Sequence, residues 1–291
     1  EDQPRPALIS APPMPTDHTA SPPPAPSPHM RAALDQAAAA QGTTSPNPPV
    51  GAVIVRDGEI IAAGHTQQAG QSHAEVMALA AAGDRARGAE VYVTLEPCAH
   101  HGRTPPCTDA LIQAGVASVH YALRDPFPEV DGRGHQLLEA AGIEVTTGDG
   151  ADQSRQLLAG YLKHQATGLP LVIVKYAASL DGKIAAASGD SRWVSGPDTL
   201  AWAHRQRPTL DAIVVGSNTL LLDDPQLTAR PPVADGDIRE AADPAVHQPT
   251  RIVVDSRGRI APTARIFQRT PHLAAPPPVA PASLVAARSV L

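Results

Sequence analysis

Residues 73–115 read HAEVMALAAAGDRARGAEVYVTLEPCAHHGRTPPCTDALIQAG, and this stretch carries the signals of two helices with a strand between them. The first helical pattern begins at residue 73 and closes at Gly83, a residue type that commonly ends helices. The segment VYVTLE, residues 91–96, predicts a strand, and TDALIQAG, residues 108–115, predicts the second helix. Strands that alternate with short helices are typical of a layered α/β domain.

The same alternation continues on both sides of this stretch. Two strands are expected within GAVIVRDGEIIAAG, residues 51–64, joined by a turn at Asp57-Gly58. The other predicted elements are a helix at 30–41, a strand at 117–123, a helix at 135–142 and a strand directly after it. We therefore expect an α/β domain over residues 30–148, followed by a connecting helix within the linker 149–170.

A second α/β unit is expected after the linker. A new set of strands begins at LVIVKYA, residues 171–177, and continues through LDAIVVG, 210–216, and RIVVD, 251–255. These segments predict a partial domain over residues 171–270. The ends are rich in proline, which lacks an N–H group and fixes φ, so we expect a disordered tail at 1–29 and a proline-rich tail at 271–291.

Composition excludes several classes of protein. Hydrophobic residues make up 42% of the 291 residues, as in ordinary globular proteins. The net charge of −6 and the absence of a long Lys/Arg run argue against a nucleic-acid-coating role. No apolar stretch is long enough to predict a transmembrane helix, and two cysteines are too few for a disulfide scaffold. With no visible secretory signal, we expect a cytoplasmic protein that makes no membrane contact.

Three residues of the opening stretch are candidate zinc ligands. His73 begins a predicted helix, Cys98 follows a predicted strand, and Cys107 begins the next helix, where the positive end of the helix dipole favours a thiolate. Three protein ligands leave a fourth position for water, as in catalytic zinc sites. Glu75 lies two residues after the histidine, close enough to move a proton without binding the metal.

Other interpretations of these residues remain open from the sequence. Cys98 and Cys107 could form a disulfide bond or be inert. His100 or His101 could supply a fourth ligand, which would make the zinc structural. The combination of His-x-Glu before a helix and Pro-Cys after a strand favours catalytic zinc. Zinc deaminases of nucleobases carry H-x-E and P-C-x-x-C, but here eight residues separate the two cysteines.

That long spacer points to a known family. PCAHHGRTPPC (97–107), with HAE (73–75) and SPNPPVG (45–51), resembles the deaminase half of the bifunctional riboflavin-biosynthesis deaminase–reductase. The likeness continues, in the order of the family, over about residues 30–267. Its second half is carried by KYAASLDGKIAAASGDSRWVSG (175–196), DAIVVGSNTLLLDDPQLTAR (211–230) and RIVVDS (251–256).

The resemblance implies a fold and two activities. The fold would be a cytidine-deaminase-like three-layer domain followed by a dihydrofolate-reductase-like α/β domain. The first domain would be a zinc-dependent hydrolase that cleaves a cyclic amidine C–N bond and so deaminates 2,5-diamino-6-(5-phosphoribosylamino)pyrimidin-4(3H)-one. The second domain would be an oxidoreductase that reduces the ribosyl group with NADPH. The partner is then a small-molecule nucleotide, and a homo-oligomer is compatible with the resemblance because family members are often oligomeric.

The resemblance also assigns site residues. His73, Cys98 and Cys107 become the zinc ligands, and Glu75 becomes the residue that passes a proton from water to the ring nitrogen and the leaving ammonia. The positions that match substrate-binding residues are Asn47, Arg103, Asp125, Lys175, Ser191, Arg207, Leu227 and Arg230. The positions that match NADPH-binding residues are Ala177, Trp193, Thr219, Asp223 and Ser256.

The chain departs from the family at three places. Thr66 stands where the family commonly has His, and Phe127 stands where it has Asn, so we expect pyrimidine recognition to be weakened or changed. Gly258 and Asp255 are the last glycine and the last acidic residue, so residues 259–291 lack the Gly-rich loop for a dinucleotide phosphate and a substrate-contacting Glu. We therefore expect a C-terminally truncated reductase half.

Three alternatives to a deaminase with an incomplete reductase half remain. The chain could be fully bifunctional, which requires NADPH binding without the expected loop. It could deaminate another base or tRNA, although its negative charge and long cysteine spacer argue against this. It could also be a non-catalytic binding or assembly protein that keeps the fold, an interpretation supported by Thr66 and Phe127.

Overall fold

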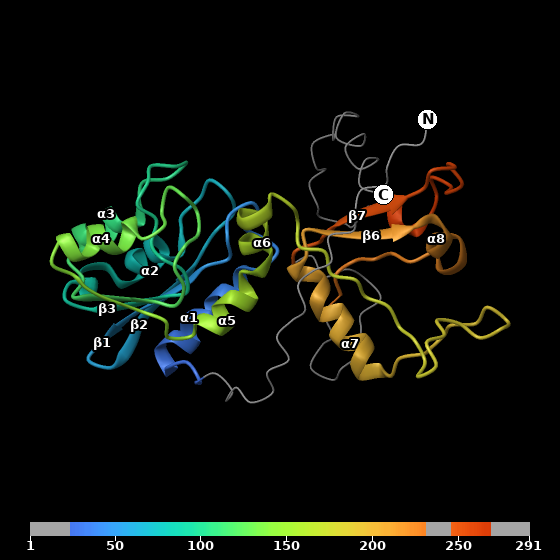
Figure 1. Cartoon of the computed structure of the whole chain (residues 1–291), viewed down its shortest axis with the longest axis horizontal. Helices are drawn as coiled ribbons and strands as arrows, with labels where there is room; N and C mark the ends of the chain where they lie inside the picture. Colours follow the sequence, from blue (N-terminus) through green and yellow to red (C-terminus); the bar gives the residue numbers. More distant parts are fainter. Residues whose placement is uncertain (1–23, 231–245, 269–291) are drawn as a thin grey trace, which may run out of the picture.

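The computed structural model describes residues 24–230 and 246–268, which form two α/β halves (Figure 1). The predicted tail 271–291 lies outside the described residues, as does most of the predicted tail 1–29. Helix α1 (Pro28–Ala40) takes the last two residues of that tail, because Pro28 suits a first helical position and the Ser27 hydroxyl accepts a hydrogen bond from the Met30 N–H. No helix among the described residues is long and apolar enough to cross a membrane.

The first half is built on a five-stranded sheet of order β2-β1-β3-β4-β5. Its strands are β1 (Gly51–Arg56), β2 (Glu59–His65), β3 (Glu90–Val93), β4 (Ser118–Tyr121) and β5 (Glu144–Thr147). Strand β1 is antiparallel to β2 and β3, whereas β3, β4 and β5 are parallel. The predicted turn is confirmed: Asp57 and Gly58 both have positive φ, as a tight hairpin turn requires.

Helices cover both faces of this sheet (Figure 1). They are α1, α2 (Ala74–Ala82), α3 (Cys107–Ala114), α4 (Arg133–Ala140), α5 (Ala151–Leu157) and α6 (Ala159–Thr167). Ala52 and Ile54 of β1 pack in the core shared with α2, α3 and α4, whereas Val53 and Val55 pack on α1. This alternation produces two buried layers, so the predicted three-layer domain is confirmed.

The single connecting helix predicted within the linker 149–170 is instead two helices. Helix α5 ends at Leu157 and α6 begins at Ala159, with Leu158 between them in a non-helical conformation. Leu158 is only 1% exposed and packs in the core with α2, α3 and α4. The chain therefore bends where this apolar side chain enters the core. Helix α6 lies between the two halves (Figure 1).

The second half has a smaller regular framework in the part that the structure describes. Its elements are α7 (Pro197–Gln206), β6 (Ala212–Gly216), α8 (Ser217–Asp223) and β7 (Thr250–Val254), with short 3₁₀ turns at Arg207–Thr209 and Arg265–Phe267; a further 3₁₀ turn, Gly83–Ala86, follows α2 in the first half. Strands β6 and β7 pair in parallel, which confirms the expected strands at 210–216 and 251–255.

The strand predicted at residues 171–177 is wrong. The segment has no ladder partner among the described residues, and Val172 and Val174 are 74% and 78% exposed. A run of apolar residues indicates a buried strand only where a neighbouring strand supplies the hydrogen bonds and a second layer covers the side chains. Neither is present around this segment in the described part of the chain.

Candidate active site

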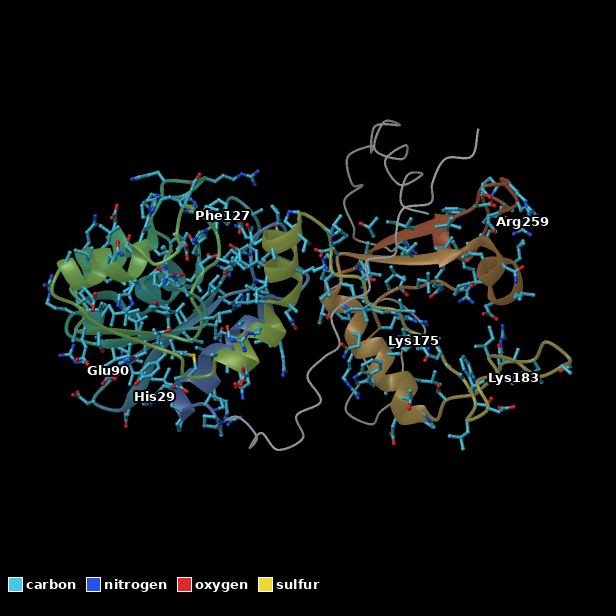
Figure 2. All side chains as sticks on the ribbon, in the orientation of Figure 1. His29, Glu90, Phe127, Lys175, Lys183 and Arg259 are labelled. Atoms are coloured by element: carbon cyan, nitrogen blue, oxygen red, sulfur yellow. The ribbon has the colours of Figure 1, made fainter. Side chains whose placement is uncertain are left out.

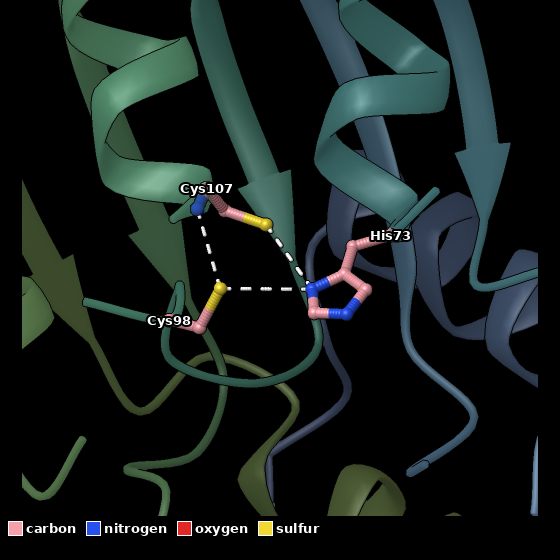
Figure 3. Close-up of side chains that lie close together, drawn as sticks. All are labelled: His73, Cys98 and Cys107. Atoms are coloured by element: carbon pink, nitrogen blue, oxygen red, sulfur yellow. Dashed lines mark hydrogen bonds between the residues drawn. The ribbon is translucent and has the colours of Figure 1, made fainter. Parts of the chain in front are cut away.

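The three predicted zinc ligands meet at one edge of the first sheet. His73 immediately precedes α2, Cys98 lies in the loop after β3, and Cys107 is the first residue of α3. Strands β2, β3 and β4 run in the same direction, so their carboxyl ends and the starts of α2 and α3 share this edge. The side chains converge in Figure 3, although up to 34 residues separate them in sequence.

The distances between these side chains fit a tetrahedral metal site. The Nδ1 atom of His73 lies 3.3 Å from the Cys107 Sγ and 3.6 Å from the Cys98 Sγ, and the three ligand atoms lie within 4.8 Å of one another (Figure 3). With Zn–S and Zn–N bonds of about 2.3 and 2.0 Å, tetrahedral ligand atoms are about 3.6 Å apart. The residues present therefore fit zinc.

The alternative roles of nearby residues do not match the geometry. Cys98 and Cys107 are free thiols rather than a disulfide. Among the described residues, neither His100 nor His101 belongs to the ligand cluster: His101 is exposed, and the Nε2 atom of His100 lies 3.9 Å from a Glu129 carboxylate oxygen. Three protein ligands leave a coordination position open, which is the arrangement of a catalytic zinc site.

The local electrostatics favour a bound cation. A hydrogen bond from the Cys107 thiol lowers the pKa of Cys98 to about 4, with further help from His73 and the Cys107 backbone N–H at the start of α3. The same hydrogen bond raises the pKa of Cys107, because Cys107 is the thiol that donates its proton to Cys98. The lowered pKa of Cys98 favours the thiolate that a metal ion requires, and metal binding would displace the proton of Cys107.

Glu75 lies in the first turn of α2, and its side chain is only 4% exposed. Burial raises the pKa of this carboxyl group to about 7, and the negative charge on Cys98 acts in the same direction. A group with a pKa near the working pH can both accept and release a proton during one reaction. The structure therefore places a suitable proton carrier beside the metal ligands.

One pocket of about 310 Å³ opens over these groups. It is lined by His73, Cys98 and Glu75, and by Asn47, Arg103 and Asp125, the residues predicted to hold the substrate in this half. The structure thus brings all three of these residues to the metal ligands, while their roles stay predictions. Thr66 and Phe127, the two departures from the family pattern, line the same pocket.

The two departures have structural roles of their own. The Thr66 hydroxyl accepts a hydrogen bond from the Val50 N–H at 3.2 Å, and its side chain is 2% exposed. The Phe127 ring lies 5.4 Å from the His100 ring, centre to centre, and the Phe127 backbone N–H donates to Asp125. Phe127 therefore presents an apolar surface to the pocket where an amide would present hydrogen-bonding groups.

Glu96 is an important residue that sequence reasoning missed. Its side chain is 3% exposed, and its carboxylate accepts backbone hydrogen bonds from Gly132 and His135 at the start of α4, at 3.1 and 3.2 Å, and from Asp125 at 3.4 Å. A carboxylate at this position caps the helix and holds the loop that carries Asp125. The signal in the sequence was an acidic residue at the end of the predicted strand 91–96.

Replacing Glu96 with Gln should lower the free energy of unfolding by about 2–3 kcal/mol, because an amide N–H₂ group would face buried backbone N–H groups. Urea denaturation measures the change. Glu59→Gln, on the exposed face of β2, is the matched control and should change stability by less than about 0.5 kcal/mol. Equal stabilities for the two variants would show that Glu96 is not needed as an acceptor.

The second half brings together Arg207 and Arg230, its two predicted substrate-binding arginines. The Arg207 guanidinium donates to the Thr228 carbonyl oxygen at 2.9 Å, and burial together with the nearby Arg230 lowers the pKa of Arg207 to about 10. Burial and the same two arginines lower the pKa of His204 to about 4. Both shifts show that the two guanidinium groups lie close to each other and to His204.

The other predicted residues of the second half do not share one site in the described part of the chain. Ser191 and Trp193 line a second pocket, and Asp223 lies 3.5 Å from Arg192 in an ion pair. Trp193 is 74% exposed. Lys175, Thr219 and Ser256 are also exposed, whereas Ala177 and Leu227 are half-buried. These side chains do not form a cradle that fits NADPH.

Comparison with known proteins shows which family the chain resembles in each of its two halves. A family model for the cytidine and deoxycytidylate deaminase zinc-binding region matches residues 25–123, and a model for the RibD C-terminal domain matches residues 170–276. The riboflavin biosynthesis protein RibD of Mycobacterium tuberculosis is 48% identical over 240 residues, which cover 82% of this chain and 68% of the relative. The chain belongs to the RibD family.

Further RibD proteins agree with this assignment. Escherichia coli RibD is 49% identical over 243 residues, covering 83% of this chain and 66% of the relative. Acinetobacter baumannii RibD matches in structure with a TM-score of 0.71 at 44% identity, covering 82% of this chain and 65% of that one. A deaminase/reductase from Thermotoga maritima gives a TM-score of 0.73 at 38% identity, covering 83% and 66%.

These findings confirm the family and the fold class. The chain carries a cytidine-deaminase-like zinc-binding domain followed by a RibD C-terminal domain of the dihydrofolate-reductase-like type. It spans slightly less than two thirds of the length of the first curated relatives, with 66% of the Escherichia coli protein and 64% of the Haemophilus influenzae protein. Residues 124–169 belong to neither matched range.

Proposed function

We propose that this chain hydrolytically deaminates 2,5-diamino-6-(5-phosphoribosylamino)pyrimidin-4(3H)-one, a step of riboflavin biosynthesis. One observation carries the proposal: two of the three residues of the metal cluster, His73 and Cys98, line the same pocket as Glu75, a buried carboxyl group whose pKa is about 7. The names of the RibD relatives support the pathway, and the name of the Thermotoga maritima protein supports the reaction.

His73, Cys98 and Cys107 would hold the zinc ion. When bound, zinc supplies a Lewis acid that lowers the pKa of water and so provides a nucleophile at neutral pH. Glu75 accepts the proton of the attacking water and transfers it to the adjacent ring nitrogen. Glu75 then takes the proton of the hydroxyl group added to the ring carbon and delivers it to the amino group, so the C–N bond breaks, ammonia leaves and the hydroxyl becomes a carbonyl group.

The rest of the pocket would bind and orient the nucleotide. Arg103 is exposed at the pocket and carries a planar fork suited to a phosphate group. Asn47 and Asp125 offer donors and acceptors for the polar edge of the pyrimidine. Phe127 supplies an apolar surface, and we expect it to change recognition of the pyrimidine relative to family members that carry Asn.

The second half would bind the phosphorylated sugar through Arg207 and Arg230, in keeping with its match to the RibD C-terminal domain. Reduction of the ribosyl group with NADPH remains outside the proposal, because the described residues do not form a cofactor cradle. We place the reaction in the cytoplasm, because thiols are kept reduced in that compartment and Cys98 and Cys107 must be reduced to bind a metal ion. A net charge of −6 argues against tRNA as the substrate.

The rates of ammonia release from two pyrimidine nucleotides test the substrate assignment. The zinc-loaded chain should deaminate the diamino-ribosylaminopyrimidinone phosphate at least about 100-fold more efficiently, in kcat/KM, than it deaminates dCMP, because a site built for particular polar groups rejects an analogue that leaves them unpaired. A higher efficiency with dCMP would contradict the substrate assignment. Failure to release ammonia from either compound would favour a non-catalytic protein.

A further inference from the structure

Helix α6 forms one wall of the deaminase pocket. Tyr161 and Gln165, one helical turn apart, both line the pocket together with Glu75 and Asp125. This helix lies between the two halves of the chain (Figure 1) and outside both matched ranges, 25–123 and 170–276. The segment that joins the two domains therefore contributes side chains to the pocket of the first.

Tyr161 makes a specific contact with Asp125. Its hydroxyl donates a hydrogen bond to the Oδ1 atom of Asp125 at 2.8 Å, and the Phe127 backbone N–H donates to the same oxygen at 2.9 Å. Among the described residues, no hydrogen bond reaches the other oxygen, Oδ2. Two donors on Oδ1 fix the orientation of the carboxylate and leave Oδ2 as an acceptor for a molecule in the pocket.

The burial of Asp125 and its two hydrogen bonds act on the pKa of its carboxyl group in opposite directions. Asp125 is 6% exposed, and burial raises the pKa of its carboxyl group, while both hydrogen bonds lower it. The Tyr161 ring packs against the core of the first half, so the position of the hydroxyl is set by the fold. Loss of either donor would therefore raise the pKa of the Asp125 carboxyl group further.

We propose that Tyr161 is a positioning residue for the deamination: it holds Asp125 so that Oδ2 accepts a hydrogen bond from an N–H or O–H group of the bound nucleotide. The inference rests on the proposed function and adds the linker helix to the deaminase site. Tyr161 acts through Asp125 and is not one of the metal ligands.

Kinetics of Tyr161→Phe test this role, because the change keeps the ring and removes only the donor. The KM for the diamino-ribosylaminopyrimidinone phosphate should rise by about tenfold, while kcat changes by less than about twofold, as expected for a contact made equally before and during the reaction. Tyr92→Phe is the matched control: the Tyr92 hydroxyl also donates to a carboxylate, that of Glu90 at 3.0 Å, but outside the pocket. It should leave both constants unchanged.

A double-mutant cycle separates positioning from general stability. If Tyr161 acts through Asp125, Tyr161→Phe should change KM by less than about twofold in an Asp125→Asn background. Equal effects of Tyr161→Phe with and without Asp125 would overturn the inference, as would an unchanged KM in the single variant. A wild-type chain that releases no ammonia would instead overturn the proposed function, and this inference with it.

Discussion

Glu75→Gln should lower kcat by about 1,000-fold or more while zinc content stays at the wild-type level, because the amide cannot carry a proton between water and the leaving group. The side chain is 4% exposed and close in size to its replacement, so the pocket should keep its shape. Removing the carboxylate also removes its repulsion with the Cys98 thiolate, so metal binding should not weaken.

Two measurements on the same sample check this prediction: metal analysis for zinc and ammonia release for turnover. Glu144→Gln, an exposed substitution on β5, is the matched control and should keep full activity. Near-normal turnover by the Glu75 variant would show that another group moves the proton. Loss of zinc together with activity would show that Glu75 has a role in metal binding.

Cys107→Ser should lose both zinc and activity. Cys107 is fully buried at the start of α3, and its Sγ lies 3.3 Å from the His73 Nδ1. A hydroxyl would replace a thiolate ligand, and no other His, Cys, Asp or Glu in the described part of the chain belongs to this cluster. We expect less than about one tenth of the wild-type zinc content and no measurable ammonia release. Chelation followed by added zinc should restore the wild-type chain and not the variant.

His101→Ala is the control that tests the number of protein ligands. His101 lies near Cys98 in sequence but is exposed and outside the ligand cluster. The variant should keep its zinc. Loss of zinc from His101→Ala, or from the corresponding His100→Ala, would reveal a fourth protein ligand. The zinc would then be structural rather than catalytic.

The zinc ligands could be predicted from the sequence because short local patterns mark their positions. His73 and Cys107 stand at the start of a helix, and Cys98 lies in the loop that follows a strand; such boundaries can be predicted from short patterns. The alternation of strands and helices then places these boundaries at one sheet edge. The burial of Glu75, which raises its pKa, came only from the packed structure.

The features that were missed depend on contacts between distant segments. Glu96 caps α4 across more than thirty residues, and Tyr161 reaches Asp125 from a helix that the sequence presented as a plain connector. The strand expected at 171–177 was wrong for the same reason, since its apolar pattern says nothing of whether a neighbouring strand pairs with it. Tertiary packing decides each of these cases.

The most direct test of the central claim is the mass of the product formed in oxygen-18-labelled water. The zinc-loaded chain and the diamino-ribosylaminopyrimidinone phosphate should yield a product in which one amino group is replaced by one labelled oxygen, with ammonia released in equal amount. The Glu75→Gln chain should give no product under the same conditions. An unchanged substrate, or a product without labelled oxygen, would contradict hydrolytic deamination at this site.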